Sequence, residues 1–422
     1  MPIRSFDKFS IETGETSDVS LTGQPQRYAS QALSAGFATT ALIVLSLNLR
    51  PAIVSLPPLT TDIQRDLGWG NAAIGLITSI PILCMAILSP VVPRIAARWG
   101  RVPTTTGALV LILLGSGLKL FADTMPVLLP ISAVFAGLGI AIGAGLAPAF
   151  VREWFPNRIG AMTGLYSAAL IFGAAIGSAA SVPLMHLTGS WAEAMASWSA
   201  LAFASVLLWI LVSLRQRRHD AAQPAAPPVI AKGLPWRSPL AWTLAGYLGL
   251  NAFIFYSLLA WMAPSFSERG WTQQNAGFLL ALSSIAQMFG ALVLPRFMNR
   301  FASRRTLFIM VMAMGIVGTV GVGFMPQIAP LVFISVQGIG IGGTFALGIA
   351  LLSEYSATPA DAARLTALTF LVSYILGALG PVLMGILLSA HHSWELLYGI
   401  LGVLLICQLL LALPLKRGLT VS

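Results

Sequence analysis

The stretch LSLNLRPAIVSLPPL, residues 45–59, places Arg50 inside an apolar segment and follows it directly with Pro51. The preceding residues, 32–48, carry no charge. A guanidinium cannot lose its proton, and its exposure to acyl chains is costly. Pro51 also removes the backbone donor that would bond the Leu47 carbonyl. Since broken helices at membrane depth occur where they line a cavity, this stretch predicts a kinked spanning helix at a cavity wall.

The composition extends this interpretation to the whole chain. Of 422 residues, 57% are hydrophobic and only 9% are charged, with a mean hydropathy of +0.84, whereas a soluble domain carries about a quarter charged residues. Runs of roughly 20 apolar residues can span a bilayer as helices. The sequence therefore predicts an all-α membrane protein with twelve spans, at approximately 33–57, 71–93, 103–122, 127–150, 160–184, 194–214, 239–262, 274–295, 305–325, 329–352, 365–389 and 396–414.

The two ends of the chain are expected in the cytoplasm. The first 28 residues are polar and lack the pattern of a signal peptide, which predicts a retained tail. With that tail inside, the outer side keeps only Arg65, Lys119 and Arg269. The inner side collects Arg94, Arg98, Arg101, Arg152, Arg158, Arg215, Arg217, Arg218, Lys232, Arg237, Arg296, Arg300, Arg304, Arg305, Arg364, Lys416 and Arg417. This asymmetry follows the positive-inside rule, so the net charge of +10 is an orientation signal and does not indicate a nucleic-acid partner.

One polar stretch, RQRRHDAAQPAAPPVIAKGLPWRSP at 215–239, has the composition of an exposed linker. It divides the chain into a tail (1–32), a six-helix bundle (33–214), a cytoplasmic linker (215–238), a second six-helix bundle (239–414) and a tail (415–422). The halves also resemble each other at an offset of 202–203 residues. That offset pairs Pro93, Arg94 and Arg98 with Pro295, Arg296 and Arg300, Asn48 with Asn251, and Thr163 and Gly177 with Thr366 and Gly380.

The offset predicts two pseudo-symmetric bundles, an arrangement found in many secondary transporters, with the substrate site between the halves near the midplane. The alternative is a chance likeness between apolar segments. Glycine-rich stretches at 136–148 and 337–348 are patterns that let helices approach closely, although they could equally act as hinges. Cys84 and Cys407 lie in apolar runs and are expected to pack without a disulfide.

Arg50 is the leading candidate for a substrate contact. Every Asp and Glu falls in a tail, a loop or a span end, so the sequence offers it no obvious counter-ion. A guanidinium in a wet cleft suits a planar, delocalised anion, because its fork of donors matches such acceptors. The alternative is a structural arginine that bonds freed carbonyls such as that of Leu47.

Other polar residues within the spans could complete this site. Each needs a hydrogen-bond partner away from water, so interhelical bonding is the alternative for all of them, and an interfacial belt position is the alternative for Trp261. The predicted substrate-binding set is Arg50, Asn48, Tyr166, Asn251, Tyr256, Gln287, Gln337 and Tyr374.

The sequence also argues against other chemistries. No histidine or carboxylate is placed for a midplane proton relay. No Walker loop, HExxH or GxSxG stretch is present, and a membrane enzyme would need a cluster of nucleophile, base or metal ligands at depth. We therefore expect no enzymatic activity, no cofactor and no metal.

With these residues in view, the chain resembles the cyanate porter group of the major facilitator superfamily over nearly all its spans. The most specific segments are LNLRPAIVSLPPL (47–59), AWTLAGYLGLNAFIFYSLLAWMAPSF (241–266), NAGFLLALSSIAQMFGALVLPRFMNR (275–300) and GIGIGGTFALGIALLSEYS (338–356). The resemblance implies the superfamily fold, alternating access of two bundles, Arg50 at the substrate site, and small anions or compact polar heterocycles as cargo.

One motif departs from the superfamily pattern. The loop after the second span usually carries an acid before Arg-x-Gly-Arg, but Ala97 stands there, and Asn299 in the second copy. An ion pair through that acid is therefore excluded. Cytoplasmic gate contacts stay open as a role for the retained arginines, with positive-inside anchoring as the alternative. They are Arg94, Arg98, Arg101, Arg296 and Arg300.

The sequence thus predicts a secondary transporter in a bacterial inner membrane that carries a small, cyanate-like anion. A proton or a counter-anion is the candidate coupling ion, and the chain is expected to act as a monomer in the bilayer. The alternative is an exporter of drugs or metabolites, such as nitroimidazoles, with the same fold.

Overall fold

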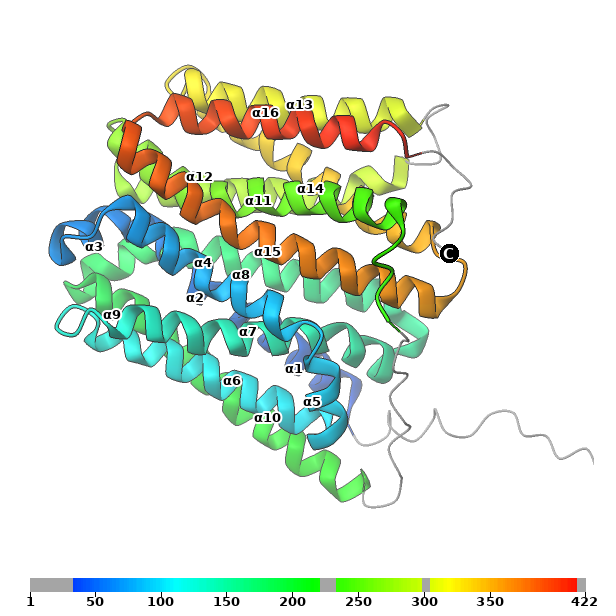
Figure 1. Ribbon diagram of the computed structural model, residues 1–422. Helices are drawn as coiled ribbons and strands as arrows, with labels where there is room; N and C mark the ends of the chain where they lie inside the picture. The colour runs from blue at the N-terminus through cyan, green and yellow to red at the C-terminus, as the bar shows by residue number, and fades with distance from the viewer. Residues whose placement is uncertain (1–32, 221–232, 298–303, 416–422) are drawn as a thin grey trace, which may run out of the picture.

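The computed structural model describes residues 33–220, 233–297 and 304–415, and its regular elements are all helices (Figure 1). Twelve helical stretches in these ranges are long and apolar enough to cross a membrane, which confirms the predicted all-α membrane fold. The α-helices are α1 (Ala35–Asn48), α2 (Pro51–Val54), α3 (Thr60–Leu67), α4 (Asn71–Leu88), α5 (Val92–Trp99), α6 (Arg101–Leu118), α7 (Leu128–Trp154), α8 (Ile159–Thr188), α9 (Trp191–Ala196), α10 (Ser199–Asp220), α11 (Pro239–Glu268), α12 (Gln273–Val293), α13 (Arg304–Phe324), α14 (Pro330–Glu354), α15 (Pro359–His391) and α16 (Trp394–Ala412). Short 3-10 segments join them: η2 (Pro57–Leu59), η3 (Lys119–Phe121), η4 (Pro156–Arg158) and η5 (Leu294–Phe297).

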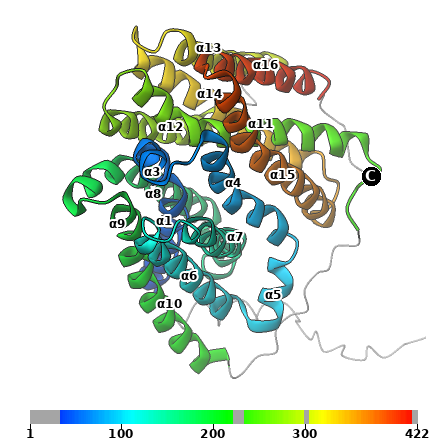
Figure 2. The same cartoon turned by 60° about the vertical axis from the view of Figure 1, so that its left-hand side comes forward.

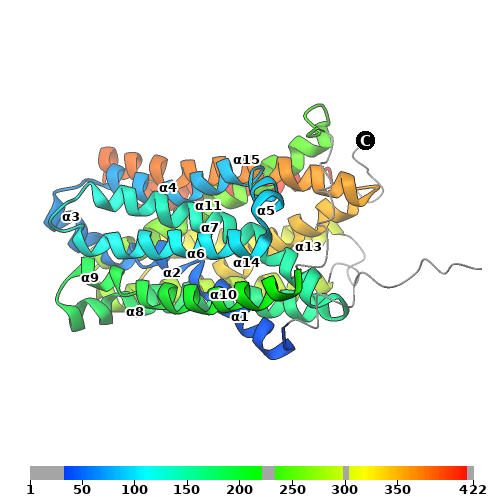
Figure 3. The same cartoon turned by 90° about the horizontal axis from the view of Figure 1, so that it is seen from below.

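The long helices run side by side, so the bundle has two ends (Figures 1 and 3). One end carries α3 and α9 and is called the α3 end; the other carries α5 and is called the α5 end. Helices α1 to α10 gather in the lower part of Figure 1, and helices α11 to α16 gather above them. A turned view shows α4 and α8 of the first half next to α15 and α12 of the second (Figure 2).

The internal repeat appears in the packing of glycines. A Cβ on Gly177 of α8 would lie 2.9 Å from Pro51 Cα in the first span. Its repeat partner, Gly380 of α15, would bring a Cβ to 2.6 Å from the Phe253 carbonyl oxygen in α11. In each half, therefore, a glycine lets the fifth helix of that half approach its first helix closely, as small residues do between membrane helices.

The first span differs from its prediction in length. It was expected to end at residue 57, but it continues through η2 and α3 to Leu67. Helix α3 contains Asp62, Arg65 and Asp66, and a hydropathy pattern does not mark such a polar end. Helix α10 likewise continues to Asp220, beyond the predicted end at 214, and residues 221–232 of the predicted linker lie outside the described residues.

The two halves meet tightly at the α3 end. Gln273 at the start of α12 donates a hydrogen bond of 2.8 Å to Asp62 in α3. A Cβ on Gly277 would lie 2.8 Å from the Ser178 carbonyl oxygen, and one on Gly385 would lie 2.5 Å from the Asn71 carbonyl oxygen. The backbones of opposite halves are thus in direct contact at this end.

Candidate functional site

The first span is broken where the sequence predicts a kink. Helix α1 ends at Asn48, Leu49 and Arg50 stand outside any helix, and α2 begins at Pro51. Proline is well placed at a helix start, because its missing N–H would be unpaired there anyway. Arg50 adopts φ −122° and ψ −38°, and its carbonyl accepts hydrogen bonds from the N–H groups of Ile53 and Val54. Arg50 therefore caps the start of α2, and its carbonyl belongs to the first turn of that helix.

The Arg50 side chain lies at the boundary between the halves. Its guanidinium carbon is 5.8 Å from the centroid of the Phe255 ring in α11, within the range of a cation–π contact. Among the described residues, no acid pairs with this guanidinium and no hydrogen bond engages it. Arg50 is only half-buried. The structural alternative, in which Arg50 bonds freed carbonyls, is therefore not what the described residues form.

Three tyrosines from the predicted set lie near one another at this boundary, and one of them, Tyr374, interacts with the cation. Tyr374 of α15 lies within electrostatic range of Arg50, Tyr256 of α11 and Tyr166 of α8. Tyr374 and Tyr166 are half-buried, whereas Tyr256 is 4% exposed. The cluster therefore draws side chains from both halves of the chain, and we call Arg50, Tyr166, Phe255, Tyr256 and Tyr374 the Arg50 cluster.

The amide residues of the predicted set lie elsewhere and have protein partners. Asn48 donates to Ser205 of α10 and to the Val44 carbonyl. Asn251 donates to Thr344 of α14 at 2.7 Å.

The glutamines likewise bond within their own half. Gln287 donates to Ser283 on its own helix at 3.2 Å, and Gln337 donates to Thr319 of α13 at 3.2 Å. Trp261, the possible belt residue, is 1% exposed and donates to the Pro381 carbonyl. These residues therefore form hydrogen bonds between helices or within their own helix, which is the alternative to substrate binding that the sequence left open.

The predicted gate arginines lie apart from the Arg50 cluster. Arg101 pairs with Glu153 of α7, and Arg94 donates to the Pro90 carbonyl. Both bonds stay within the first half. Arg98 and Arg296 are exposed, and Arg300 lies outside the described residues.

Sequence reasoning missed two residues near the first span. Phe255 looked like one of many apolar residues, and only the fold brings its ring to Arg50. Lys119 was placed only on the outer side, near the end of the third predicted span; the structure adds that it is 2% exposed and donates a 2.7 Å hydrogen bond to the Ala52 carbonyl. A lysine near a span end ordinarily reaches water. The sequence signal for Lys119 was the pair Pro57 and Pro58. Their missing N–H groups leave the carbonyls of Ile53 and Val54 without helical partners, so the helix breaks beside Ala52 and a donor from elsewhere is needed.

The groups of the Arg50 cluster are suited to binding and not to covalent chemistry. A cation without an acid attracts an anion or a polarised group, and aromatic rings offer flat faces. The described residues contain no group of three or more His, Cys, Asp or Glu that could hold a metal. The cluster also has no nucleophile with an adjacent base, as covalent catalysis requires.

Comparison with known proteins agrees with this architecture. The family model of the Major Facilitator Superfamily matches residues 36–334 and 264–420. The 2-nitroimidazole transporter of Escherichia coli (strain K12) is 30% identical over 377 residues, covering 89% of this chain and 94% of that protein. Cyanate transport protein CynX of the same organism is 29% identical over 353 residues, covering 84% and 90%.

A solved structure shows the same fold. A bacterial homologue of the human lysosomal transporter Spinster, in an inward-facing and occupied conformation, superposes with a TM-score of 0.70 at 16% identity, covering 89% of this chain and 95% of that one. The chain therefore belongs to the major facilitator superfamily of secondary transporters, and its relatives place it in the cyanate porter group.

Proposed function

We propose that this transporter moves a small anion or compact polar solute of cyanate-like size, and that Arg50 binds the cargo. The observation that carries the proposal is the Arg50 guanidinium, which has no acid partner among the described residues and lies between the two halves. An unpaired cation at membrane depth is costly, and an anionic or strongly polarised cargo offsets that cost.

The aromatic neighbours support a flat cargo. Phe255 and Tyr374 are half-buried rings on α11 and α15, and a planar anion or heterocycle can stack on such rings while it accepts hydrogen bonds from the guanidinium fork. The names of two relatives, one for cyanate and one for 2-nitroimidazole, agree with that size and shape.

Alternating access follows from the position of the cluster. Substrate sites between paired bundles open to one side and then to the other as the bundles rock. The tight contacts of Gln273, Gly277 and Gly385 with the first half support a state in which the α3 end is closed. Transport then requires these contacts to separate.

We further propose that both termini lie in the cytoplasm of a bacterial inner membrane. The basic excess around the α5 end, with Arg94, Arg98, Arg101, Arg152 and Arg158, is the basis of this orientation. The α3 end then faces outward. Fusion of a reporter that is active only in the cytoplasm to the C-terminus should give an active reporter.

The direction of transport has two candidates. Import of a free anion against an inside-negative potential costs about 2.3 kcal/mol per charge per 100 mV, so import requires co-transport of a proton or exchange for another anion. Export of an anion is favoured by the same potential. Export of drugs or metabolites such as nitroimidazoles is the second candidate function, and it is motivated by the 2-nitroimidazole relative.

The experiment is counterflow in proteoliposomes that contain the purified protein. Labelled cyanate and labelled 2-nitroimidazole are tested as probes against an excess of unlabelled probe inside. Saturable accumulation of either probe supports the proposal and identifies the cargo class. Failure of both probes to exchange faster than in protein-free vesicles contradicts it. Flux measured under an imposed potential and pH gradient then separates import from export.

A further inference from the structure

The second half of the first span contains carbonyl groups that its own helix does not bond. Helix α2 ends at Val54, and Ser55 and Leu56 lie outside any helix before η2 begins at Pro57. In a continuous helix the Ala52 carbonyl would accept from the Leu56 N–H, but no such bond occurs in the described backbone. The next carbonyl, that of Ile53, would need an N–H at Pro57, which proline lacks.

An unbonded carbonyl inside a membrane-spanning bundle costs several kcal/mol. Lys119 removes that cost for Ala52, because its Nζ donates to the Ala52 carbonyl oxygen at 2.7 Å. The lysine comes from η3, directly after α6, and is 2% exposed. A hydrogen bond from a charged donor is stronger than one between neutral groups. Lys119 therefore holds the short helix α2 of the first span against the third span.

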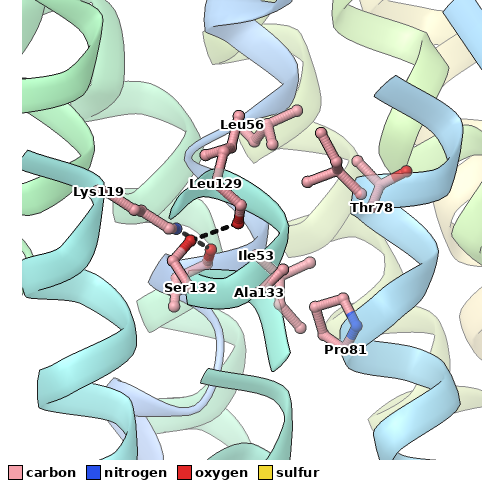
Figure 4. Close-up of a pocket in the computed structure, with 10 residues that line it drawn as sticks. Ile53, Leu56, Thr78, Pro81, Lys119, Leu129, Ser132 and Ala133 are labelled. Atoms are coloured by element: carbon pink, nitrogen blue, oxygen red, sulfur yellow. Dashed lines mark hydrogen bonds between the residues drawn. The ribbon is translucent and has the colours of Figure 1, made fainter. Parts of the chain in front are cut away.

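A small cavity adjoins this bond. Its volume is about 20 Å³, which is enough for one water molecule. Figure 4 shows Lys119 and Ser132 reaching into the same space, with Thr78 and Pro81 across from them. The hydroxyl groups of Ser132 and Thr78 already donate to backbone carbonyls. Their oxygen atoms can therefore only accept, from the ammonium or from a water. The surroundings suit a protonated lysine that donates and does not pair with an acid.

Elements around Lys119 bring it no opposite charge. Among the described residues, no acid pairs with Lys119. Glu193 of the neighbouring α9 is exposed, and so is Asp123, which follows η3. The bond to Ala52 is thus the main polar contact that this side chain makes.

The segment that Lys119 holds is the one that carries Arg50. The break at Leu49–Arg50 separates α2 from α1, so α1 does not fix the position of Arg50 through a continuous helix. The Arg50 carbonyl instead accepts hydrogen bonds from the N–H groups of Ile53 and Val54 in α2. Ala52 lies inside this same hydrogen-bonded turn. A displacement of Ala52 therefore moves Arg50 with it.

We infer that Lys119 is a positioning residue for the Arg50 cluster: it anchors the four-residue α2 through the Ala52 carbonyl and so fixes where the Arg50 guanidinium meets cargo. This inference rests on the proposed role of Arg50. Lys119 itself does not touch the cargo. Its removal lowers affinity for cargo because Arg50 is no longer held in one place.

The test combines a local measurement with a binding measurement. Hydrogen–deuterium exchange of peptides covering residues 50–59 is compared between the parental protein and Lys119→Met, which keeps an unbranched apolar side chain of similar length without the donor. We expect faster exchange in these peptides, no change in peptides of α12 and α15, and affinity for the cyanate or 2-nitroimidazole probe lowered about tenfold. Lys119→Arg, which restores a long cationic donor, should recover most of the affinity.

Arg269→Met is the matched control. Arg269 is also a largely buried cation that bonds helix-end carbonyls, those of Val322 and Gly323. It differs in that it also pairs with Glu395 and lies in the second half. Its loss should lower the melting temperature without faster exchange at 50–59. If Lys119→Met does not fold, Lys119→Gln replaces it, because its uncharged amide ends one atom short of the Lys119 Nζ position; exchange at 50–59 should again be faster than in the parental protein.

Two results overturn the inference. One is unchanged exchange at 50–59 in a Lys119 variant with a lowered melting temperature; the other is the same local exchange in Arg269→Met. If the proposed function is wrong, neither probe binds the parental protein. The exchange measurement still tests the role of Lys119 in that case, because it needs no cargo.

Discussion

Arg50 and Lys119 are two cations along one broken span, and their surroundings differ. The Arg50 guanidinium has no hydrogen-bond partner among the described residues and meets a ring of the opposite half. The Lys119 ammonium is buried and bonded to a carbonyl. A free cation at the boundary fits cargo binding, whereas a bonded cation inside one half fits support of the backbone. The sequence distinguishes the two poorly, because both are single charges in apolar runs.

Two-point hydrogen bonding by the Arg50 guanidinium is tested by a single substitution. Arg50→Lys keeps the charge but replaces two parallel donors with a point charge, so we expect affinity for a planar anion to fall about 10- to 100-fold, as loss of a charge-assisted hydrogen bond implies. The binding constant of the probe that exchanges in counterflow measures this. Equal affinity in Arg50→Lys would show that two-point contact is not used.

The ring beside Arg50 gives a second residue-scale prediction. Phe255→Leu keeps an apolar side chain but removes the ring that faces the guanidinium at 5.8 Å. A cation–π contact is worth about 0.5–2 kcal/mol, so affinity for the probe should fall severalfold. Phe289→Leu, in an exposed position of α12, is the control and should bind as the parental protein does. A Phe255→Leu variant that binds equally well contradicts a role for the ring.

At the scale of elements, α8 depends on glycine where it meets the broken span. A Cβ on Gly177 would lie 2.9 Å from Pro51 Cα, whereas nothing lies within 4 Å of a Cβ on Gly164 in the same helix. Gly177→Ala should therefore destabilise the protein by about 1–3 kcal/mol through overpacking. Gly164→Ala should be neutral or stabilising by up to about 1 kcal/mol, since alanine favours helix. Melting curves in detergent compare the two, and equal melting temperatures would contradict close packing at Gly177.

At the scale of the whole molecule, transport requires the α3 end to open. With Cys84 and Cys407 replaced by alanine, a short bis-methanethiosulfonate should link Asp62→Cys to Gln273→Cys, because the parental side chains are bonded across the halves. We expect transport to stop and to return after reduction. Trp271→Cys with Gln327→Cys, a bonded pair within the second half, is the control and should continue to transport when linked. Transport by the linked Asp62–Gln273 pair contradicts this account of the closed end.

The large-scale arrangement was accessible from the sequence, because hydropathy counts spans and the repeat pairs Gly177 with Gly380. The kink was accessible too, since proline removes a donor wherever it stands. Partners were not accessible: Asn48 and Asn251 occupy equivalent repeat positions, yet one bonds α10 and the other bonds α14. Side-chain pairing depends on the rotation of each helix, which apolar runs with no marked polar face do not specify.

The central claim is that Arg50 holds the cargo between the halves. Isothermal titration of cyanate and of 2-nitroimidazole into the purified parental protein, Arg50→Ala and Arg158→Ala tests it most directly, since Arg158 is an exposed arginine of η4. The account predicts binding of at least one probe by the parental protein and by Arg158→Ala, with no detectable binding by an Arg50→Ala protein that melts normally. Parental affinity in Arg50→Ala would contradict it.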